Sequence, residues 1–291
     1  MWYPLEVMRT DQLLKEAKRT LVDVNERFGW QGDEEDQAWD MLVHVWGRQP
    51  DDDDDVPRDI ERKFDKLVER RTTGEPLAFI LGWVDFLDFR LHLKHGAFVP
   101  RLTTEWLAQQ AIRRIRRRPK PVHVDLATGI GPVAIGSARA VPKARVYGLD
   151  ISRKALNQAK ANAARLGVRN VTFIRSDMFS ALPKNLKGNV DVVTIHPPYV
   201  PRDELSDLPV EIKKFEPRHT LTDRSSDGLG LVRRVVDEAR DWLRPGGWLL
   251  IEIVAAEFRR IAPMLRKAGY ADIKSTHGSL KLTRVIVAKH P

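Results

Sequence analysis

The segment at residues 194–200, with the sequence TIHPPYV, places a histidine where it could take part in chemistry. The apolar run at 190–195 predicts a strand, and the prolines after it predict an abrupt end in a rigid loop. A neutral imidazole at His196 could accept one hydrogen bond and donate another. Because histidine titrates near neutral pH, the residue could also act as a general base. The alternative is a histidine that only fills the end of the strand.

A glycine-rich loop follows the strand expected at 122–126, in the sequence DLATGIG at residues 125–131. Glycine lets the backbone approach a ligand closely, because no Cβ lies between them. Together with Ala134, Gly129 and Gly131 satisfy the G-x-G-x-x-A pattern of dinucleotide-binding proteins. This pattern is weak on its own, so the neighbouring residues must decide between NAD and S-adenosylmethionine.

Three features of the strand ends favour S-adenosylmethionine. Asp125 directly precedes the loop, where a carboxylate could face the ammonium or sulfonium region of this cofactor and would repel a pyrophosphate. Pro132 removes a backbone N–H that an anion would use. Acidic residues also continue at later strand ends: Asp150 closes the next strand about 20 residues after the glycines, where it could bind ribose hydroxyls. Asp177 follows a further strand and could bind the adenine amino group, although each of these last two aspartates could alone be a helix N-cap.

Alternation of strands and helices after residue 121 predicts the α/β framework that would position these residues. Such alternation is typical of a Rossmann-like, doubly wound parallel sheet, in which ligands bind at the carboxyl ends of the strands. Helices are expected at 153–167 and 230–247. No helix separates the last two strands, which predicts a final antiparallel hairpin at the sheet edge. The expected strands are 122–126, 145–150, 171–175, 190–195, 248–253, 271–276 and 282–290.

The first part of the chain is predicted to form a small helical domain. Apolar residues recur with helical spacing at 13–21, 38–45 and 60–68. Five consecutive aspartates at 51–55 would repel one another and are expected to form a solvated loop, not a metal site. The helical pattern then stops, and alternation at 78–93 predicts a β-hairpin connector. The expected domains are residues 1–73, the connector 74–100 and the cofactor-binding domain 101–291.

Composition excludes several classes of protein. The chain has 291 residues and no cysteine, which excludes disulfides, thiolate metal sites and cysteine nucleophiles. No apolar run could span a bilayer and no signal peptide is evident, so a cytoplasmic location without membrane contact is expected. The formal net charge of +9 suggests either polyanionic partners such as nucleic acid or general solubility. A basic helix expected at 104–120 could contact phosphates, although a solvated helix face is favoured.

These motifs resemble those of the release factor glutamine N5-methyltransferases, the HemK or PrmC family of class I methyltransferases. The likeness spans nearly the whole chain and includes the tetrad His196-Pro197-Pro198-Tyr199, which is normally Asn-Pro-Pro-Tyr. The other matching segments are the D-x-x-T-G-x-G loop at 125–131, Gly74-Glu75-Pro76, the I-P-R-P-D-T-E-like segment at 98–105, Phe215-Glu216-Pro217 and Asp227-Gly228-Leu229.

The resemblance implies a helical N-terminal domain for substrate recognition, a β connector and a Rossmann-like catalytic domain that binds S-adenosylmethionine. In the family tetrad, an Asn carbonyl and the first proline's backbone carbonyl can each accept one N–H of an amide, while the aromatic packs on the flat substrate. Pro197 and Tyr199 are expected in these catalytic roles, and His196 is expected to orient or deprotonate the nucleophile. The expected cofactor contacts are Asp125, Ala127, Thr128, Gly129, Gly131, Asp150, Ile151, Asp177, Met178 and His196, and the expected substrate contacts are Arg101, Thr104, Glu105, Pro198 and Glu216.

Departures from the family pattern leave the methyl acceptor open. His196 replaces asparagine, Leu102 and Thr103 replace Pro-Asp, and Val254 stands where the family has the glycine of its E-x-G segment. A protein side chain ranks first as acceptor, with a release-factor glutamine as the parental substrate. A small molecule and nucleic acid are alternatives. A non-catalytic S-adenosylmethionine-binding protein, which lost turnover with its asparagine, is a different class of function. No metal is expected.

Overall fold

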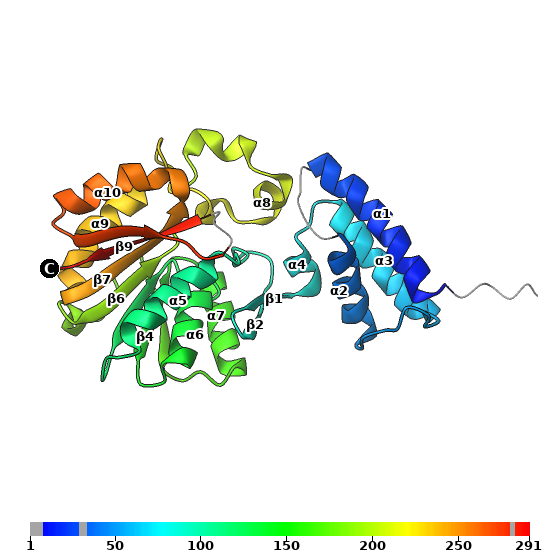
Figure 1. The fold of residues 1–291 in the computed structure, drawn as a ribbon, viewed down its shortest axis with the longest axis horizontal. Coiled ribbons are helices and arrows are strands. Elements are labelled where there is room, and N and C mark those ends of the chain that lie inside the picture. Colours follow the sequence, from blue (N-terminus) through cyan, green and yellow to red (C-terminus); the bar gives the residue numbers. More distant parts are fainter. Residues whose placement is uncertain (1–7, 29–33, 280–282) are drawn as a thin grey trace, which may run out of the picture. The chain divides into compact units, whose positions relative to one another are not determined.

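The chain divides into two compact units, a helical unit and an α/β unit, each with its own core (Figure 1). The described residues up to Trp83, together with Leu208–Phe215, form the helical unit, and Val84–Asp207 with Glu216–Pro291 form the α/β unit. No helix in the described ranges is long and apolar enough to cross a membrane. This computed structural model describes residues 8–28, 34–279 and 283–291.

The helical unit contains the three helices that apolar periodicity predicted. Their periodic apolar residues are buried together in one core, in which Leu21, Met41 and Phe64 are nearly inaccessible. The aspartate run forms a loop whose side chains are largely exposed. The helices of this unit are α1 (Thr10–Phe28), α2 (Glu34–Trp46), α3 (Arg58–Thr72), α4 (Leu77–Leu81) and α8 (Val210–Phe215).

The helical unit extends beyond the boundary expected at residue 73. Pro76 lies at the N-cap position of α4, and Gly82 ends this helix in a left-handed conformation with a φ of 78°. Ile80 and Leu81 of α4 pack into the core of the helical unit. The prediction of strand alternation from residue 78 was therefore wrong for α4, because a short apolar run fits a single helical turn as well as a strand.

The predicted β-hairpin is present as β1 (Trp83–Phe86) and β2 (Phe89–His92), which pair in a two-stranded sheet. Leu87 in its turn has a φ of 54°, which is uncommon for a bulky residue. The carboxylate of Glu105 accepts a 2.6 Å hydrogen bond from the Leu87 N–H. Glu105, which was expected to contact substrate, therefore stabilises this turn.

A seven-stranded sheet forms the centre of the α/β unit, in the order β5-β4-β3-β6-β7-β9-β8. The strands from β5 to β7 are parallel, and β9 is antiparallel to both β7 and β8. The predicted doubly wound sheet and its C-terminal antiparallel hairpin are thus confirmed. The strands are β3 (Val122–Leu126), β4 (Arg145–Asp150), β5 (Val171–Arg175), β6 (Val190–Ile195), β7 (Leu243–Val254), β8 (Ala271–Thr276) and β9 (Thr283–Lys289).

Helices cover both faces of this sheet, as the doubly wound topology requires (Figure 1). The α5, α6 and α7 helices lie against one face, and α9 and α10 pack with the apolar side chains of the other. Their bounds are Thr104–Ile115 for α5, Pro132–Ala140 for α6, Arg153–Arg165 for α7, Gly230–Trp242 for α9 and Phe258–Lys267 for α10.

The β7 strand is longer than predicted. The helix expected to continue to residue 247 ends at Trp242, and β7 begins at Leu243. Pro245 therefore lies inside a strand, at an irregularity in the pairing with β6. A bulge of this kind tolerates proline, which a regular interior strand does not, and this is why the sequence indicated a helix end instead.

Candidate active site

The β3 and β6 strands bring the two chemical motifs together at the carboxyl edge of the sheet. They are parallel neighbours, with Leu126 in register with Ile195. The glycine loop therefore starts beside the start of the tetrad at residues 196–199. Ligands of doubly wound sheets bind at this edge, so the positions of the two motifs fit one common site.

Backbone conformation and packing explain the glycines of the loop. Gly129 and Gly131 have φ values of 57° and 89°, in the region that favours glycine, and Ala127 before them has a φ of 51°. A Cβ on Gly131 would lie 3.1 Å from the ring of Phe173, whereas a Cβ on Gly129 would meet nothing within 4 Å. Gly131 is therefore needed for the fold, while Gly129 borders open space in which a ligand could lie.

Asp125 is buried and joins the glycine loop to the strand of the tetrad. Its carboxylate accepts 2.6 Å hydrogen bonds from the hydroxyls of Thr128 in the loop and Thr194 on β6. Nε2 of the buried His123 lies 2.8 Å from the same Thr194 oxygen. Since that hydroxyl donates to Asp125, a neutral His123 must donate to Thr194. The carboxylate is thus turned toward two threonines, and its expected contact with the cofactor stays a prediction.

Burial has opposite effects on the two titratable members of this network. It raises the pKa of Asp125 to about 7, although the bonds from Thr128 and Thr194 oppose the change. It lowers the pKa of His123 to about 3. Both shifts favour the uncharged form, as expected for groups with no access to water.

Asp150 at the end of β4 holds the glycine loop in place. One carboxylate oxygen accepts a 2.9 Å hydrogen bond from the Gly129 N–H and the other a 2.8 Å bond from the Ser152 N–H. Ser152 itself caps α7, so the N-cap alternative for Asp150 does not apply. Each carboxylate oxygen keeps a second lone pair, which leaves capacity for a ribose hydroxyl. The next side chain, Ile151, is 49% exposed, an unusual apolar surface at this edge.

The side chain of Asp177 is bound by α9. Its exposed carboxylate forms a 2.9 Å ion pair with Arg234 of α9. The following residue, Met178, has a φ of 46° and is buried in the core between the sheet and α9. The carboxylate is therefore engaged by Arg234, 57 residues further along the chain, and its expected contact with adenine stays a prediction.

His196 is enclosed by aromatic and polar side chains. Its ring stacks on Tyr199 at a centroid distance of 5.9 Å and meets the ring of Phe98 edge-on at 5.5 Å. Its Nδ1 lies 3.4 Å from the hydroxyl of Thr104 and 3.6 Å from a carboxylate oxygen of Glu252. Within the described part of the chain, Nε2 makes no hydrogen bond. The protein thus contacts the ring at Nδ1 and leaves Nε2 without a hydrogen-bond partner among the described residues.

The surroundings of His196 favour its neutral form. Burial lowers the pKa of the ring, Glu252 opposes this effect, and the positive charge of Arg101 adds to it. The net direction is below the ordinary value of 6.5. At neutral pH the ring is therefore uncharged and one of its nitrogens can accept a hydrogen bond.

Arg101 and Glu216 form an ion pair within the α/β unit. Their charged atoms lie 2.7 Å apart, and the guanidinium of Arg101 also lies 4.5 Å from the ring centroid of Phe98. The Glu216 carboxylate is buried, so the paired arginine offsets the cost of removing it from water. Because Phe98 contacts His196, this pair lies beside the tetrad, and the expected contact of both residues with substrate stays a prediction.

A second loop supports the tetrad from a distant part of the sequence. Tyr199 forms an isolated antiparallel bridge with Thr222, and the Val200 N–H donates to the Leu221 carbonyl at 2.9 Å. Gly228 has a φ of 69°, and a Cβ there would lie only 2.0 Å from the Tyr199 carbonyl oxygen. The glycine of the D-G-L element, which the sequence shows only as a segment that matches the family, is thus a contact of the tetrad.

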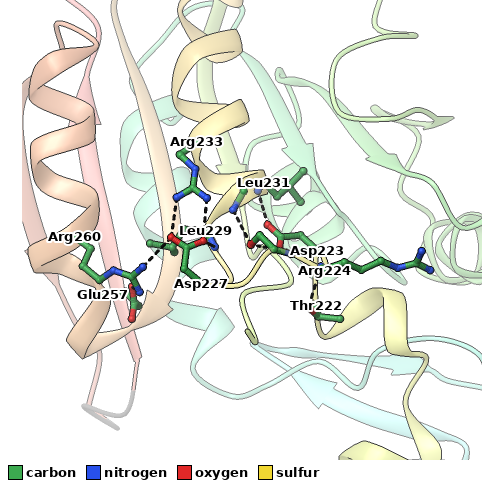
Figure 2. A network of polar contacts seen from close by, with 11 residues as sticks. Thr222, Asp223, Arg224, Asp227, Leu229, Leu231, Arg233, Glu257 and Arg260 are labelled. Atoms are coloured by element: carbon green, nitrogen blue, oxygen red, sulfur yellow. Dashed lines mark hydrogen bonds and ion pairs between the residues drawn. The ribbon is translucent and has the colours of Figure 1, made fainter. Parts of the chain in front are cut away.

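A polar network anchors this second loop to α9 and α10 (Figure 2). One oxygen of Asp223 accepts a 2.6 Å bond from the Leu231 N–H in the first turn of α9. Both oxygens of Asp227 pair with Arg233 at 2.9 Å, and Arg260 of α10 binds the same carboxylate at 2.9 Å. The paired arginines hold the pKa of Asp227 well below its usual range. The loop that contacts Tyr199 is therefore fixed at both of its aspartates.

The basic segment at the end of α5 lies at the opposite edge of the sheet. The guanidinium of Arg114 is 4.5 Å from the ring centroid of Trp248 and donates to the Gln110 side chain at 2.8 Å. The residues at 116–121 lead into the amino end of β3, whereas both motifs lie at carboxyl ends. A packed and solvated helix end explains this charge better than a phosphate contact at the site.

Comparisons with known proteins agree with this geometry. A family model described as a methyltransferase domain matches residues 119–280. The release factor glutamine methyltransferase of Rhodopirellula baltica is 34% identical over 229 residues, which cover 76% of this chain and 76% of that protein. The release factor glutamine methyltransferase of Bordetella pertussis is 33% identical over 250 residues, which cover 84% of this chain and 91% of that protein.

Two solved structures share the fold. A methyltransferase from Pyrococcus furiosus has a TM-score of 0.51 at 15% identity, over 69% of this chain and 88% of that one. The T. thermophilus 16S rRNA N2 G1207 methyltransferase, solved in complex with AdoMet and guanosine, has a TM-score of 0.51 at 16% identity. That likeness covers 72% of this chain and 50% of the other. At these identities the structures support the class I methyltransferase fold alone.

The residues of the site fit S-adenosylmethionine. Gly129 borders the open space that close approach of a cofactor requires, Asp150 retains lone pairs at the end of β4, and Ile151 offers an exposed apolar surface. When bound, this cofactor supplies an electrophilic methyl group. With two relatives of 33% and 34% identity that it covers over most of their length, the chain belongs to the release factor glutamine methyltransferase (HemK/PrmC) family and is an S-adenosylmethionine-dependent methyltransferase.

Proposed function

We propose that this enzyme methylates the side-chain amide nitrogen of a glutamine in a protein, and that the protein is a release factor. The names of the relatives from R. baltica and B. pertussis support this substrate. The helical unit, comprising residues up to Trp83 and Leu208–Phe215, is proposed to recognise the substrate protein. A cytoplasmic location, where release factors act on ribosomes, stays a prediction.

An amide nitrogen is a difficult nucleophile because its lone pair is delocalised into the carbonyl group. A site that methylates it must hold both N–H bonds so that the nitrogen faces the methyl group in a fixed direction. Two hydrogen-bond acceptors at the correct spacing meet this need, and most of the rate gain comes from positioning. No side chain has to remove a proton before the nitrogen is oriented.

The observation that carries the proposal is the neutral ring of His196, in which one nitrogen has polar partners and the other has none among the described residues. Its Nδ1 faces Thr104 and Glu252, and its Nε2 makes no bond to the described residues. Nε2 is proposed to accept one N–H of the amide, and the backbone carbonyl of Pro197 the other. The histidine thereby takes the place of the family's asparagine carbonyl as an acceptor. Tyr199, which stacks on His196, is proposed to pack on the flat amide.

Side chains next to the tetrad are proposed to shape the rest of the acceptor site. Thr104 contacts His196, Pro198 belongs to the tetrad itself, and the ion pair of Arg101 and Glu216 lies beside Phe98. Leu102, which replaces a proline of the family pattern, is 62% exposed. A large exposed apolar side chain so near a site is suited to contact with a substrate backbone or side chain.

A methyl-transfer assay with purified release factors tests the proposed substrate. Isotopically labelled S-adenosylmethionine, the full-length enzyme and each release factor of the source organism are incubated, and the labelled residue is mapped by mass spectrometry. We expect label on one glutamine, and no label on a release factor in which this glutamine is replaced by alanine. Label that appears only in the nucleic-acid or small-molecule fraction of a cell lysate would instead identify one of the alternative acceptors.

His196→Asn tests the acceptor role of the ring. Because an asparagine carbonyl is also an acceptor, we expect kcat/KM for the release factor to stay within about tenfold of the wild-type value. In the wild type, kcat/KM should fall as the pH drops through the lowered pKa of His196, because a protonated ring accepts nothing. This acidic limb should be absent from His196→Asn. His196→Leu, which has no acceptor, should lose about 100-fold or more.

A different outcome for His196→Asn would change the proposed mechanism. If this variant lost as much activity as His196→Leu, His196 would be a general base for a more acidic nucleophile. If wild type had no turnover while His196→Asn methylated the release factor, the histidine would have removed the parental activity. Both outcomes contradict the acceptor role, and the kinetic profile of each is distinct.

Gly129→Ala tests whether the cofactor lies against the glycine loop. A Cβ at this position enters space that is open in the protein alone, so the expected folding cost is about 1 kcal/mol, from the left-handed φ of 57°. The same Cβ would meet a bound cofactor, so we expect the Kd of the Gly129→Ala variant for S-adenosylmethionine to rise by about tenfold or more. Calorimetric titration and urea unfolding give the two quantities.

Gly167→Ala is the matched control for this prediction. Gly167 also has a left-handed φ, of 68°, and open space at its Cβ position, but it follows α7 at the other edge of the sheet. It should show a similar folding cost with an unchanged Kd. Equal cofactor affinity in Gly129→Ala and wild type would place the cofactor elsewhere.

A further inference from the structure

Glu252 is a fully buried carboxylate that lies next to the tetrad. It follows Ile251 on β7, and Ile251 is in register with Ile195 of β6, the residue before His196. Parallel pairing therefore places Glu252 beside His196. A buried carboxylate is costly unless it is paired or bound by several donors, so its position calls for an explanation.

The two oxygens of Glu252 have different partners. Oε1 accepts a 3.2 Å hydrogen bond from the hydroxyl of Thr283 on β9. Oε2 has no hydrogen-bond partner among the described residues and lies 3.6 Å from Nδ1 of His196. Within the described residues, the 3.6 Å contact with His196 is thus the polar contact that this oxygen makes.

This contact distinguishes between the two neutral forms of the imidazole. The Thr283 hydroxyl donates to Oε1, which can accept in either protonation state of Glu252, and an ionised Glu252 can only accept at Oε2. The favoured partner for Oε2 is then an Nδ1 that carries the proton. Thr104, 3.4 Å from the same nitrogen, can either donate or accept and so imposes no choice. With the proton on Nδ1, the lone pair is on Nε2.

We propose that Glu252 is a positioning residue that holds His196 in the Nδ1–H tautomer, so that Nε2 is available as an acceptor for the nucleophile. This inference rests on the proposed function in one respect, namely that the nucleophile is an amide nitrogen. The role of Glu252 would compensate for the replacement of the family's asparagine by His196. The carbonyl oxygen of an asparagine is always an acceptor, whereas an imidazole nitrogen is an acceptor only in the correct tautomer.

The charged and titratable groups around His196 are consistent with a neutral ring of fixed tautomer. Glu252 faces it from β7 and Tyr199 stacks on it from its own loop. Arg101, before α5, acts on the ring while paired with Glu216. Burial and Arg101 lower the pKa of His196, and Glu252 raises it.

The proposal is tested on Glu252→Gln in the full-length enzyme. A glutamine side chain can present either its oxygen or its NH2 group to Nδ1, so it no longer selects one tautomer. In ¹⁵N-histidine-labelled wild type, NMR should show His196 with a protonated Nδ1 and an unprotonated Nε2 above pH 7. The resonance is assigned by its absence from His196→Asn. In Glu252→Gln, we expect the Nε2–H form to become populated.

Kinetics give a second readout of the same variant. We expect Glu252→Gln to lower kcat/KM by about 10- to 100-fold, because loss of an acidic partner allows the wrong tautomer. The acidic limb of the pH profile should also move to lower pH, because the group that raises the pKa of His196 is removed. In the His196→Asn background the same substitution should change kcat/KM less than about threefold.

Three results separate this inference from its alternatives. A wild-type His196 protonated at Nε2 overturns it, whatever the substrate proves to be. An equal loss of activity from Glu252→Gln in both backgrounds also overturns it, because this indicates a merely structural role. If the Nδ1–H tautomer is found but a protein glutamine is not methylated, the proposed substrate fails and the positioning role stands. Glu238→Gln on the exposed face of α9 is the matched control and should leave both readouts unchanged.

Discussion

Gly228→Ala should remove most of the methyltransferase activity, although the residue has no functional group. A Cβ at this position would lie 2.0 Å from the carbonyl oxygen of Tyr199, a distance that real Cβ contacts do not reach. The backbone of the tetrad must therefore move. Displacement of a positioning group by about 1 Å can cost about 100-fold in rate, so a loss of at least this size in kcat/KM is expected.

Stability should fall in the same variant. The left-handed φ of 69° alone costs an alanine about 1 kcal/mol. The loop cannot easily move away from Tyr199, because Asp223 and Asp227 are bonded to α9 and α10 (Figure 2). The total loss in the free energy of unfolding is expected to be about 3 kcal/mol, since the contact must be relieved by breaking some of these bonds. Urea unfolding measures it.

Gly167→Ala separates the contact from the backbone cost. Gly167 has a φ of 68°, which matches that of Gly228, but a Cβ there meets nothing within 4 Å. This control should lose only about 1 kcal/mol and keep its activity. Retention of wild-type kcat/KM by Gly228→Ala would mean that the tetrad accommodates the methyl group and that the second loop does not position it.

Local periodicity was sufficient for most of the fold. The apolar patterns predicted α1, α2, α3 and the strands of the sheet, because each pattern is set by which face a residue buries. The errors occurred where local sequence was ambiguous. The α4 helix is a single turn between a proline and a glycine, and Pro245 lies in a bulged strand, so both look like breaks in the pattern.

The meeting of the glycine loop and the tetrad could be predicted from the sequence, whereas the partners of individual side chains could not. The glycine loop and the tetrad meet because adjacent parallel strands end at the same edge, which follows from topology. Asp177, which was expected to bind the cofactor, pairs with Arg234 from a helix far along the chain, and its contact with the cofactor stays a prediction. Glu105 likewise binds the Leu87 N–H. Such partners depend on tertiary packing, which single-sequence patterns do not contain.

Glu252 and Gly228 are two residues whose contacts with the tetrad could not be predicted from the sequence. Gly228 belongs to a segment that matches the family and Glu252 to one that matches it only in part, and nothing in either segment indicates which residue it contacts. The parallel register of β6 and β7 places Glu252 beside His196, and the second loop places Gly228 against Tyr199. The motif could mark these positions, but only the three-dimensional contacts give them a reason.

Asp125→Asn and His123→Leu should change the pH dependence of stability in opposite directions. Both residues belong to the buried network through Thr194. Burial raises the pKa of Asp125 from 3.8 to about 7. The folded protein therefore binds a proton that the unfolded chain has released between these values. The contribution of Asp125 is full below pH 3.8 and is lost as the pH rises toward 7.

His123 contributes with the opposite sign. Burial lowers its pKa from 6.5 to about 3, so between these values the unfolded chain binds a proton that the folded protein does not. Its contribution is full above pH 6.5 and is lost as the pH falls toward 3. From about pH 6.5 to 4 the two residues therefore act against each other, and in the wild type their effects should nearly cancel.

When Asp125 or His123 is replaced, the remaining residue alone determines how this network makes the free energy of unfolding depend on pH. When the folded and unfolded states differ by one bound proton, the free energy of unfolding changes by about 1.4 kcal/mol per pH unit. Each residue alone therefore changes it by about 3 kcal/mol between pH 6.5 and 4. Relative to wild type, Asp125→Asn should become less stable over this fall in pH, because it lacks the carboxyl group that gains stability in acid. His123→Leu should become relatively more stable over the same range.

Urea unfolding of the three proteins at half-unit steps from pH 4 to 8 measures these slopes. Differences from wild type remove the contributions of the other titrating groups, which all three proteins share. Any constant penalty of a core substitution shifts a curve without changing its slope, so the sign of the slope is the diagnostic quantity. Parallel curves for the two variants would show that Asp125 and His123 do not titrate as separate groups. Slopes of opposite sign would establish that the glycine loop and the tetrad strand are joined through a network that is uncharged when folded in mild acid.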